Sequence, residues 1–123
     1  MKVLALDYGS ARTGVAVSDP TGTIARPLCV IERVLTDPGL AELRELVAKE
    51  QPELVVVGLP LTLRGERGEQ AQETERFVES LRGAVDVPVE LFDERFTSVL
   101  AEGDDARAAA HLLSSYLDWA RGR

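Results

Sequence analysis

The apolar run "ELVVVGLP", residues 53–60, places the strongest constraint on the fold. Its hydrophobic residues follow one another without polar alternation, which is typical of a strand covered on both faces in a parallel sheet. Parallel strands need long crossover connections, which are usually helices. Apolar residues recur at helical spacing on both sides of the run, within 40–47 and within 71–81. The chain is therefore expected to adopt an α/β fold.

Three further strands are expected from turn signals and apolar runs. Residues 2–7 and 13–18 are predicted to form an antiparallel hairpin through a tight turn that contains glycine. Residues 23–33 form the next strand, in which Pro27 indicates an edge position or a bulge. Residues 87–92 form the last strand. The sheet is therefore expected to be mixed, with an antiparallel meander followed by right-handed parallel crossovers.

Three helices supply the crossovers and the C-terminal element. The first is expected to begin at Asp37-Pro38, as cap and first turn, and to end near Gln51-Pro52. The second is expected to close at Gly83. The predicted buried faces are Leu40, Leu43, Leu46 and Val47 in the first helix, Ala71, Thr74, Phe77, Val78 and Leu81 in the second, and Ala109, Leu112, Leu113, Tyr116 and Leu117 in the third.

Composition limits the class of protein. At 123 residues the chain is expected to be one domain, residues 1–123. The start "MKVLALDYG" lacks the apolar region of a signal peptide, so a cytosolic protein without a membrane partner is expected. Cys29 is the only cysteine and is expected to be a buried apolar thiol. The net charge of −7 argues against a generic nucleic-acid binder.

Three carboxylates are expected to converge at one edge of the sheet. Asp7 ends the first strand and Glu94 follows the last one, and ligands of such sheets bind beyond the carboxyl ends of strands. Asp105 heads the apolar face of the third helix and so points at the same edge. Gly58, near the end of the buried run, falls at this edge as well.

Clustered carboxylates favour particular chemistry. Like charges repel, so such a cluster makes sense as a proton-sharing pair or as a cation site. The chain has a single cysteine and a single histidine, His111, so carboxylate oxygens are the main ligands available. Oxygen ligands favour Mg²⁺ or Mn²⁺ over zinc. Ions held by few carboxylates complete their shell with water and substrate phosphate, which predicts phosphoryl transfer or a nuclease.

Each carboxylate also has a purely structural interpretation. Asp7 alone could cap the turn that follows it, and Asp105 could be an ordinary helix N-cap. Glu94 could pair with Arg95 or Arg12. The shared placement of the three residues, and not any one of them, is what indicates a site.

Four ordered motifs resemble one known family. They are "LALDYGSARTGVAVSD", "VVVGLPLTLRGERGEQ", "FDERFTSVLAE" and "DARAAAHLLSSYLD", and together they cover nearly the whole chain. The sequence resembles the YqgF/RuvX proteins of the RuvC-related, ribonuclease H-like nuclease superfamily. It departs from them in the short connection "SVLAEGDDARAAA", where the family has a longer, often basic stretch. Either this protein lacks that segment or its residues are missing from the sequence.

The resemblance implies a fold and a function. The fold would be a ribonuclease H-like sheet of five strands in the order 3-2-1-4-5, with strand 2 antiparallel and Gly58 between Asp7 and Glu94. The site would be two-metal, with Asp7 bridging both ions and with Glu94 and Asp105 each holding one. The family is described as nucleases that mature the 5′ end of pre-16S rRNA, and also as Holliday junction resolvases acting on branched DNA. Resolution of a junction would require a homodimer.

Basic and hydroxyl side chains near the expected site are candidates for nucleic-acid binding. A guanidinium matches phosphate oxygens bidentately, so Arg12, Arg64, Arg67 and Arg95 are predicted phosphate contacts. Thr97 could bond a phosphate or cap a helix. For Arg64 and Arg67 a solvated charged loop is an equal alternative.

Two other functions fit parts of the sequence. A noncatalytic nucleic-acid-binding module would leave the acidic cluster structural. A nucleotide-binding fold of the actin and sugar-kinase kind could account for "DYGSARTG", but those proteins close two such domains around ATP.

Overall fold

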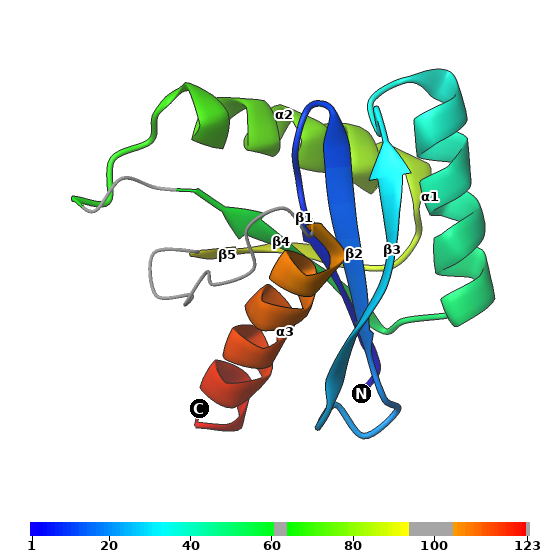
Figure 1. The fold of residues 1–123 in the computed structure, drawn as a ribbon, viewed down its shortest axis with the longest axis vertical. Coiled ribbons are helices and arrows are strands. Elements are labelled where there is room, and N and C mark those ends of the chain that lie inside the picture. Colours follow the sequence, from blue (N-terminus) through cyan, green and yellow to red (C-terminus); the bar gives the residue numbers. More distant parts are fainter. Residues whose placement is uncertain (61–63, 94–104, 123) are drawn as a thin grey trace.

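A mixed sheet forms the centre of the structure, a computed structural model that describes residues 1–60, 64–93 and 105–122 (Figure 1). Within these ranges the strands are β1 (Val3–Asp7), β2 (Arg12–Ser18), β3 (Ala25–Glu32), β4 (Leu54–Leu59) and β5 (Val89–Asp93). Their order is β3-β2-β1-β4-β5. β2 is antiparallel to β1 and β3, whereas β4 is parallel to β1 and β5. The expected strand order and the antiparallel second strand are confirmed.

β3 lies at one edge of the sheet and carries a bulge. Val15 pairs with Cys29 and Ala16 with Pro27, so the register shifts there by one residue. Pro27 has no N–H to donate, and both an edge strand and a bulge tolerate that loss. The sequence predicted an edge position or a bulge, and the structure has both. Cys29 is half-buried against the apolar core, and burial, with Glu42 and Glu50 nearby, raises the pKa of its thiol.

The helices within the described ranges are α1 (Asp37–Glu50), α2 (Glu69–Ala84) and α3 (Asp105–Arg121). None of them is long and apolar enough to cross a membrane. The predicted cap of α1 is wrong by one residue, because Thr36 is the N-cap and its Oγ1 accepts a hydrogen bond from Gly39 N at 3.2 Å. The predicted end near Gln51 is confirmed, with that residue in the left-handed conformation at φ 51°.

The predicted closure of α2 at Gly83 is also wrong. The helix continues to Ala84, and the chain leaves it in an extended conformation at Val85, whose N–H bonds to the Leu81 carbonyl. A glycine closes a helix by adopting a positive φ, and Gly83 does not have one. Its position on the exposed side of α2 is therefore incidental to the end of the helix.

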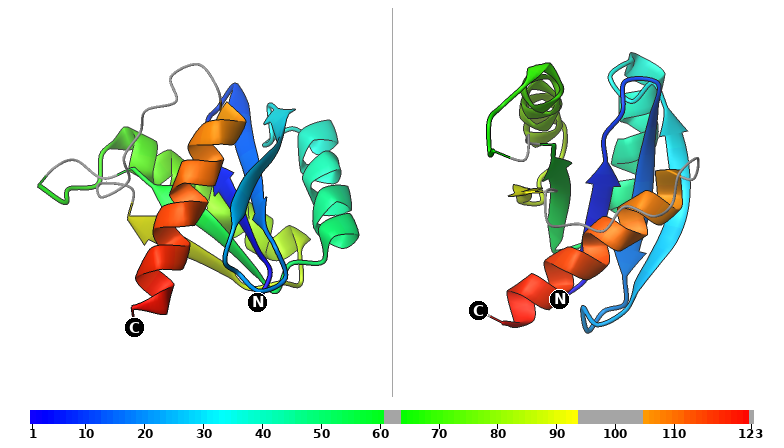
Figure 2. Two further views of the ribbon diagram at one scale, coloured as in Figure 1. Left: turned by 60° about the horizontal axis from the view of Figure 1, so that its bottom comes forward. Right: turned by 60° about the vertical axis from the view of Figure 1, so that its left-hand side comes forward.

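Helices cover both faces of the sheet, α1 and α2 on one side and α3 on the other (Figure 2). The alternation of strand side chains follows this layering: Leu4 and Leu6 of β1 pack towards α1 and α2, whereas Val3 and Ala5 pack towards α3. The same split along β4 explains why its sequence is apolar without interruption. The predicted face of α3 is buried, as are all five predicted residues of α2.

Candidate active site

Asp7 ends the central strand β1 on the face of the sheet that α3 covers. Val3 and Ala5 of the same strand pack towards α3, and the alternation of a strand carries Asp7 to that face too. Its partner across the antiparallel pair is Gly14 of β2. Asp7 is partly buried, at the carboxyl end of β1. It therefore lies where ligands of open α/β sheets bind.

The first turn of α3 rests directly on β2 at Gly14. A Cβ atom on Gly14 would lie 1.8 Å from the Asp105 carbonyl oxygen and 2.3 Å from its carbonyl carbon. Glycine is the one residue type without that atom, so it alone allows this approach. Directly opposed residues of an antiparallel pair have Cβ positions about 4.5–5.5 Å apart. The backbone of Asp105 therefore lies beside the pair formed by Gly14 and Asp7, and a site shared by the two carboxylates stays a prediction.

Gly14 was not expected to have this role, since it was predicted only as part of the hairpin. A glycine inside a strand weakens the strand and often marks a close approach of another backbone. The strand sequence "RTGVAVS" contains such a glycine, but the sequence does not show which other segment of the chain packs against it.

An ion pair links Arg12 to Asp105. Arg12 Nε lies 3.3 Å from Asp105 Oδ2, with the two side chains 63% and 36% exposed. Arg12 was predicted to contact phosphate or to pair with Glu94, and here its partner is Asp105. An ion pair this exposed contributes about 0–1 kcal/mol, so it can open when a stronger ligand of either group arrives.

Tyr8 anchors the end of β1 on the opposite face, and sequence reasoning missed it. Its ring stacks on Phe77 of α2, with centroids 4.7 Å apart, and its hydroxyl donates to Glu73 Oε1 at 3.0 Å. Burial, followed by the bond to Glu73, raises the pKa of Tyr8 to about 12. A side chain held this firmly on one face fixes the direction of Asp7 on the other.

Gly58 lies between the ends of β1 and β5, as expected. Val57 pairs with Leu6 of β1, so the next residue, Gly58, is level with Asp7. On its other side Gly58 pairs with Phe92 of β5. β5 ends at Asp93. Glu94, Arg95 and Thr97 lie outside the described residues.

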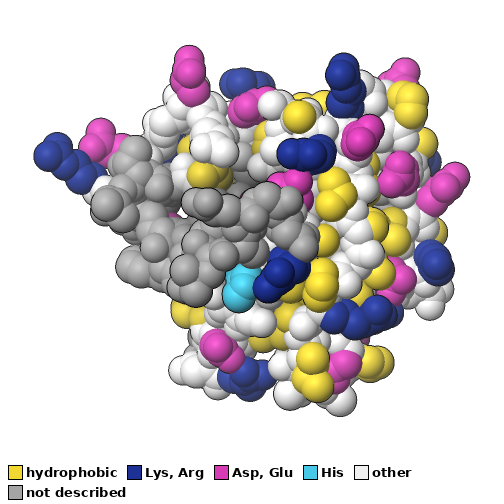
Figure 3. Space-filling view, in the orientation of Figure 1, with side chains coloured by type: hydrophobic (Ala, Val, Ile, Leu, Met, Phe, Trp, Pro, Cys, Tyr) yellow, Lys and Arg dark blue, Asp and Glu magenta, His cyan; other side chains and the backbone are white. Residues whose placement is uncertain are grey.

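The two loop arginines precede α2, which covers the other face of the sheet. Arg67 Nε and Nη2 lie 2.9 and 2.5 Å from Glu75 Oε1 of α2, and Arg64 is exposed. The pairing of Arg67 matches the charged-surface alternative better than contact with a phosphate at Asp7. Figure 3 shows basic and acidic side chains interspersed over the described part of one face of the molecule.

The side chains at this edge fit a hard divalent cation in kind. Asp7 and Asp105 offer carboxylate oxygens, and magnesium is usually bound through one or two carboxylates plus substrate phosphate. Among residues 1–60, 64–93 and 105–122, no group of three or more potential ligands is close enough to hold a metal. The third predicted ligand, Glu94, is not among those residues.

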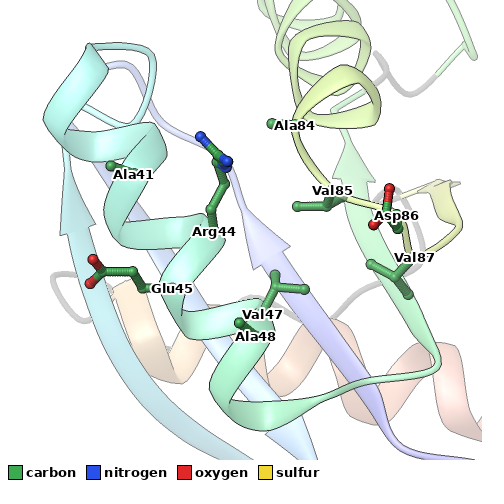
Figure 4. Close-up of a pocket in the computed structure, with 9 residues that line it drawn as sticks. All are labelled: Ala41, Arg44, Glu45, Val47, Ala48, Ala84, Val85, Asp86 and Val87. Carbon is green, nitrogen blue, oxygen red and sulfur yellow. The ribbon is translucent and has the colours of Figure 1, made fainter.

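A wide groove lies away from this edge of the sheet. It has a volume of about 560 Å³ and separates α1 from the link between α2 and β5 (Figure 4). That link precedes β5, so the groove lies at the amino ends of the parallel strands, opposite Asp7. It is lined by Ala41, Arg44, Glu45, Val47, Ala48, Ala84, Val85, Asp86 and Val87.

The strand order and the three layers define a ribonuclease H-like fold. The structure of T. thermophilus RuvC with a Holliday junction substrate matches with a TM-score of 0.63 at 19% identity, covering 99% of this chain and 96% of that one. The Fowlpox virus resolvase in complex with Holliday junction DNA matches with a TM-score of 0.61 at 12% identity, covering 98% and 99%. At these identities the likeness is one of fold.

The chain belongs to the RuvX family, described as Holliday junction resolvase, whose model matches residues 1–119. A Chloroflexus aurantiacus protein named "Putative pre-16S rRNA nuclease" is 44% identical over 131 residues, covering 94% of this chain and 86% of the relative. A Sulfurihydrogenibium protein of the same name is 41% identical over 133 residues, covering 95% and 90%. Both alignments are longer than this chain of 123 residues, so the relatives contain residues without a counterpart here. Such a difference was already expected from the sequence, because the connection before Asp105 is shorter here than in the family.

Proposed function

We propose that this chain is a divalent-metal-dependent nuclease that hydrolyses phosphodiester bonds of structured nucleic acid, with the 5′ end of pre-16S rRNA as its substrate. The observation that carries the proposal is the approach of Asp105 to Asp7 over Gly14, at the carboxyl end of the central strand. Family membership and the names of the relatives support it. In this proposal residues 1–123 act as one nuclease domain in the cytoplasm.

Mg²⁺ or Mn²⁺ would be held in a two-metal site by Asp7, Glu94 and Asp105, and would supply an activated water and charge stabilisation at the leaving 3′ oxygen. The protein would contribute by holding the carboxylate ligands in fixed positions. Asp7 is fixed by the central strand and by the anchoring of Tyr8, and Asp105 is fixed by the contact of its backbone with Gly14. Rigid ligands of this kind lower the cost of ordering the reacting groups.

Arg12 has two partners in this proposal. Without metal it neutralises Asp105 through the ion pair. A cation bound to Asp105 would weaken that attraction, leaving the guanidinium to bond a phosphate of the substrate. Arg64, Arg95 and Thr97 stay predicted contacts to nucleic acid, and Arg67 stays one only if its pair with Glu75 opens.

Resolution of four-way DNA junctions is the second candidate function. The family description and the fold shared with RuvC favour it. A junction has two symmetric strands to cut, so this function requires a two-fold homodimer. A noncatalytic nucleic-acid-binding module is the third candidate.

The test is a cleavage assay on a labelled pre-16S 5′ leader, a four-way DNA junction and a plain duplex, each with Mn²⁺ or with EDTA. Asp7→Asn and Asp105→Asn should abolish metal-dependent cleavage, whereas Asp118→Asn should leave it unchanged. Asp118 is a matched control because it lies on α3 in an exposed pair with Arg121, near the other end of the helix.

The outcomes separate the candidates. Preferred cutting of the leader supports rRNA processing, and preferred cutting of the junction supports resolution. Full cleavage by Asp7→Asn, in a preparation shown to lack contaminating nuclease, would refute the site. Binding of substrate without any cleavage would favour the noncatalytic module.

A further inference from the structure

An aromatic group lies between β5 and the C-terminal half of α3. Phe92 of β5 is 5.4 Å from Tyr116 and 5.6 Å from Trp119, measured between ring centroids, and the two α3 rings are 5.7 Å apart. These are three of only six aromatic residues in the chain. Trp119 is 49% exposed, which is high for so large an apolar side chain. The group therefore presents an aromatic surface to solvent.

A cavity of about 500 Å³ opens beside this surface. Its volume is typical of sites for small molecules, which range over about 300–1,000 Å³. A nucleic-acid base, which is a single ring system, fits within a cavity of this volume. The lining residues are Leu91, Phe92, Asp93, Ser115 and Trp119.

The cavity lies close to Asp7, on the same face of the sheet. Phe92 packs with the core under α3 and pairs with Gly58, which is level with Asp7. Two strand spacings of about 4.8 Å therefore separate Phe92 from Asp7, or roughly 10 Å. That distance corresponds to about three stacked nucleotides at ~3.4 Å each.

The charge around the cavity indicates which part of a nucleic acid would enter it. Asp93 lines the cavity, and Glu90 accepts a hydrogen bond from the Tyr116 hydroxyl at 3.4 Å. The chain as a whole has a net charge of −7. Carboxylates repel phosphate but not the face of a neutral base. An aromatic surface between carboxylates therefore suits the base and not the backbone.

We propose that this cavity binds an unpaired base of the substrate, with Trp119 stacked on it. The inference rests on the proposed function, because it assigns the substrate a single-stranded segment beside the phosphate held at Asp7. Proteins that recognise unpaired bases commonly stack them on aromatic side chains. In an intact duplex each base is already stacked and paired, so duplex binds this cavity poorly.

The chain contains one tryptophan, so fluorescence excited where tyrosine does not absorb reports on Trp119 in this cavity. The experiment titrates the full chain in EDTA, where metal-dependent cleavage is blocked, with a single-stranded RNA hexamer. The matched probes are an abasic oligomer of the same length and charge, the same hexamer in a duplex, and adenosine monophosphate. We expect saturable quenching by the single strand and little by the other three probes.

Variants test the same contact by the anisotropy of a labelled hexamer. Trp119→Ala should weaken single-strand binding by about 5- to 150-fold, the range measured for loss of one base–aromatic stack. Trp119→Phe should restore most of the affinity, because it keeps a ring. Leu35→Ala is the control, since Leu35 is similarly exposed, at 47%, and lies between β3 and α1.

The result that would overturn the inference is unchanged affinity in Trp119→Ala, or equal quenching by the abasic oligomer. Equally tight binding of adenosine monophosphate would assign the cavity to free nucleotides instead. A fluorescence change with protein concentration alone would assign the surface to self-association. Quenching by a protein that cuts nothing would support the base site while refuting the nuclease, and cleavage without quenching would do the reverse.

Discussion

The contact between Gly14 and Asp105 predicts a large effect from one added methyl group. In Gly14→Ala the new Cβ would begin 1.8 Å from the Asp105 carbonyl oxygen, and Cβ contacts shorter than 3.0 Å essentially do not occur. The first turn of α3 must therefore move away by about 1.2 Å. Gly14 has no positive φ, so steric overlap alone accounts for the cost.

Two magnitudes follow from that displacement. Overpacking of a close contact costs about 1–3 kcal/mol, and at about 4 °C per kcal/mol the Tm should fall by roughly 4–12 °C. Metal–ligand distances tolerate only about ±0.2 Å, and a misplacement of about 1 Å can lower a rate about 100-fold. Cleavage should therefore fall far more than the stability loss alone would cause.

The assay compares thermal unfolding with single-turnover cleavage at 25 °C, where the variant remains folded. Gly83→Ala is the matched control, because its Cβ would meet nothing within 4 Å on an exposed side of α2. It should raise the free energy of unfolding by several tenths of a kcal/mol and leave cleavage unchanged. Gly14→Ala with wild-type Tm would refute the close packing, and a lowered Tm with wild-type cleavage would refute the role of Asp105.

Three further substitutions have defined outcomes. Arg12→Gln should change the free energy of unfolding by less than about 0.5 kcal/mol, because the pair of Arg12 with Asp105 is exposed. In the same variant, the slope of log affinity for nucleic acid against log salt concentration should become shallower by about 1. An unchanged slope would show that Arg12 does not bind phosphate. Tyr8→Phe should lose about 0.5–1.5 kcal/mol with the bond to Glu73. Because the pKa of Tyr8 is raised to about 12, its phenol stabilises the fold fully below pH 10, and that stabilisation is lost as the pH rises towards 12, so the Tyr8→Phe difference should shrink over this interval of an alkaline denaturation series. Asp19→Asn should lower the Tm at neutral pH, because hydrogen bonds from the following turn hold the pKa of the Asp19 carboxyl below its usual value; that contribution is lost as the pH falls below about 4, and a difference constant down to pH 2 would contradict it.

Local pattern was sufficient for most of the architecture. The strands, the helical faces and the α/β class follow from periodicities of 2 and 3.6, which depend on neighbouring residues alone. Errors arose where one residue decides a boundary: Thr36 caps α1 in place of Asp37, and α2 runs past Gly83. Helix ends depend on competing local hydrogen bonds, and several residues in a row can satisfy them.

The residues of the candidate site were also predicted only in part. Asp7 and Asp105 were predicted from their places at the end of a strand and at the head of an apolar helical face, and the structure places the backbone of Asp105 on Gly14, the residue that pairs with Asp7. The contributions of Glu94, Arg95 and Thr97 stay predictions. Sequence pattern did not reveal that Gly14 admits the backbone of Asp105, nor that Tyr8 anchors β1 through Glu73.

The sequence by itself determined which strands and helices form, and it placed Asp7 at the end of the first strand and Asp105 at the start of the last helix. Only the tertiary structure decided that α3 lies on β2 at Gly14, that Arg12 pairs with Asp105, and that Phe92 meets Trp119 beside a cavity. These contacts join residues far apart in the chain. They depend on where α3 crosses the sheet, and side-chain packing over the whole face sets that crossing.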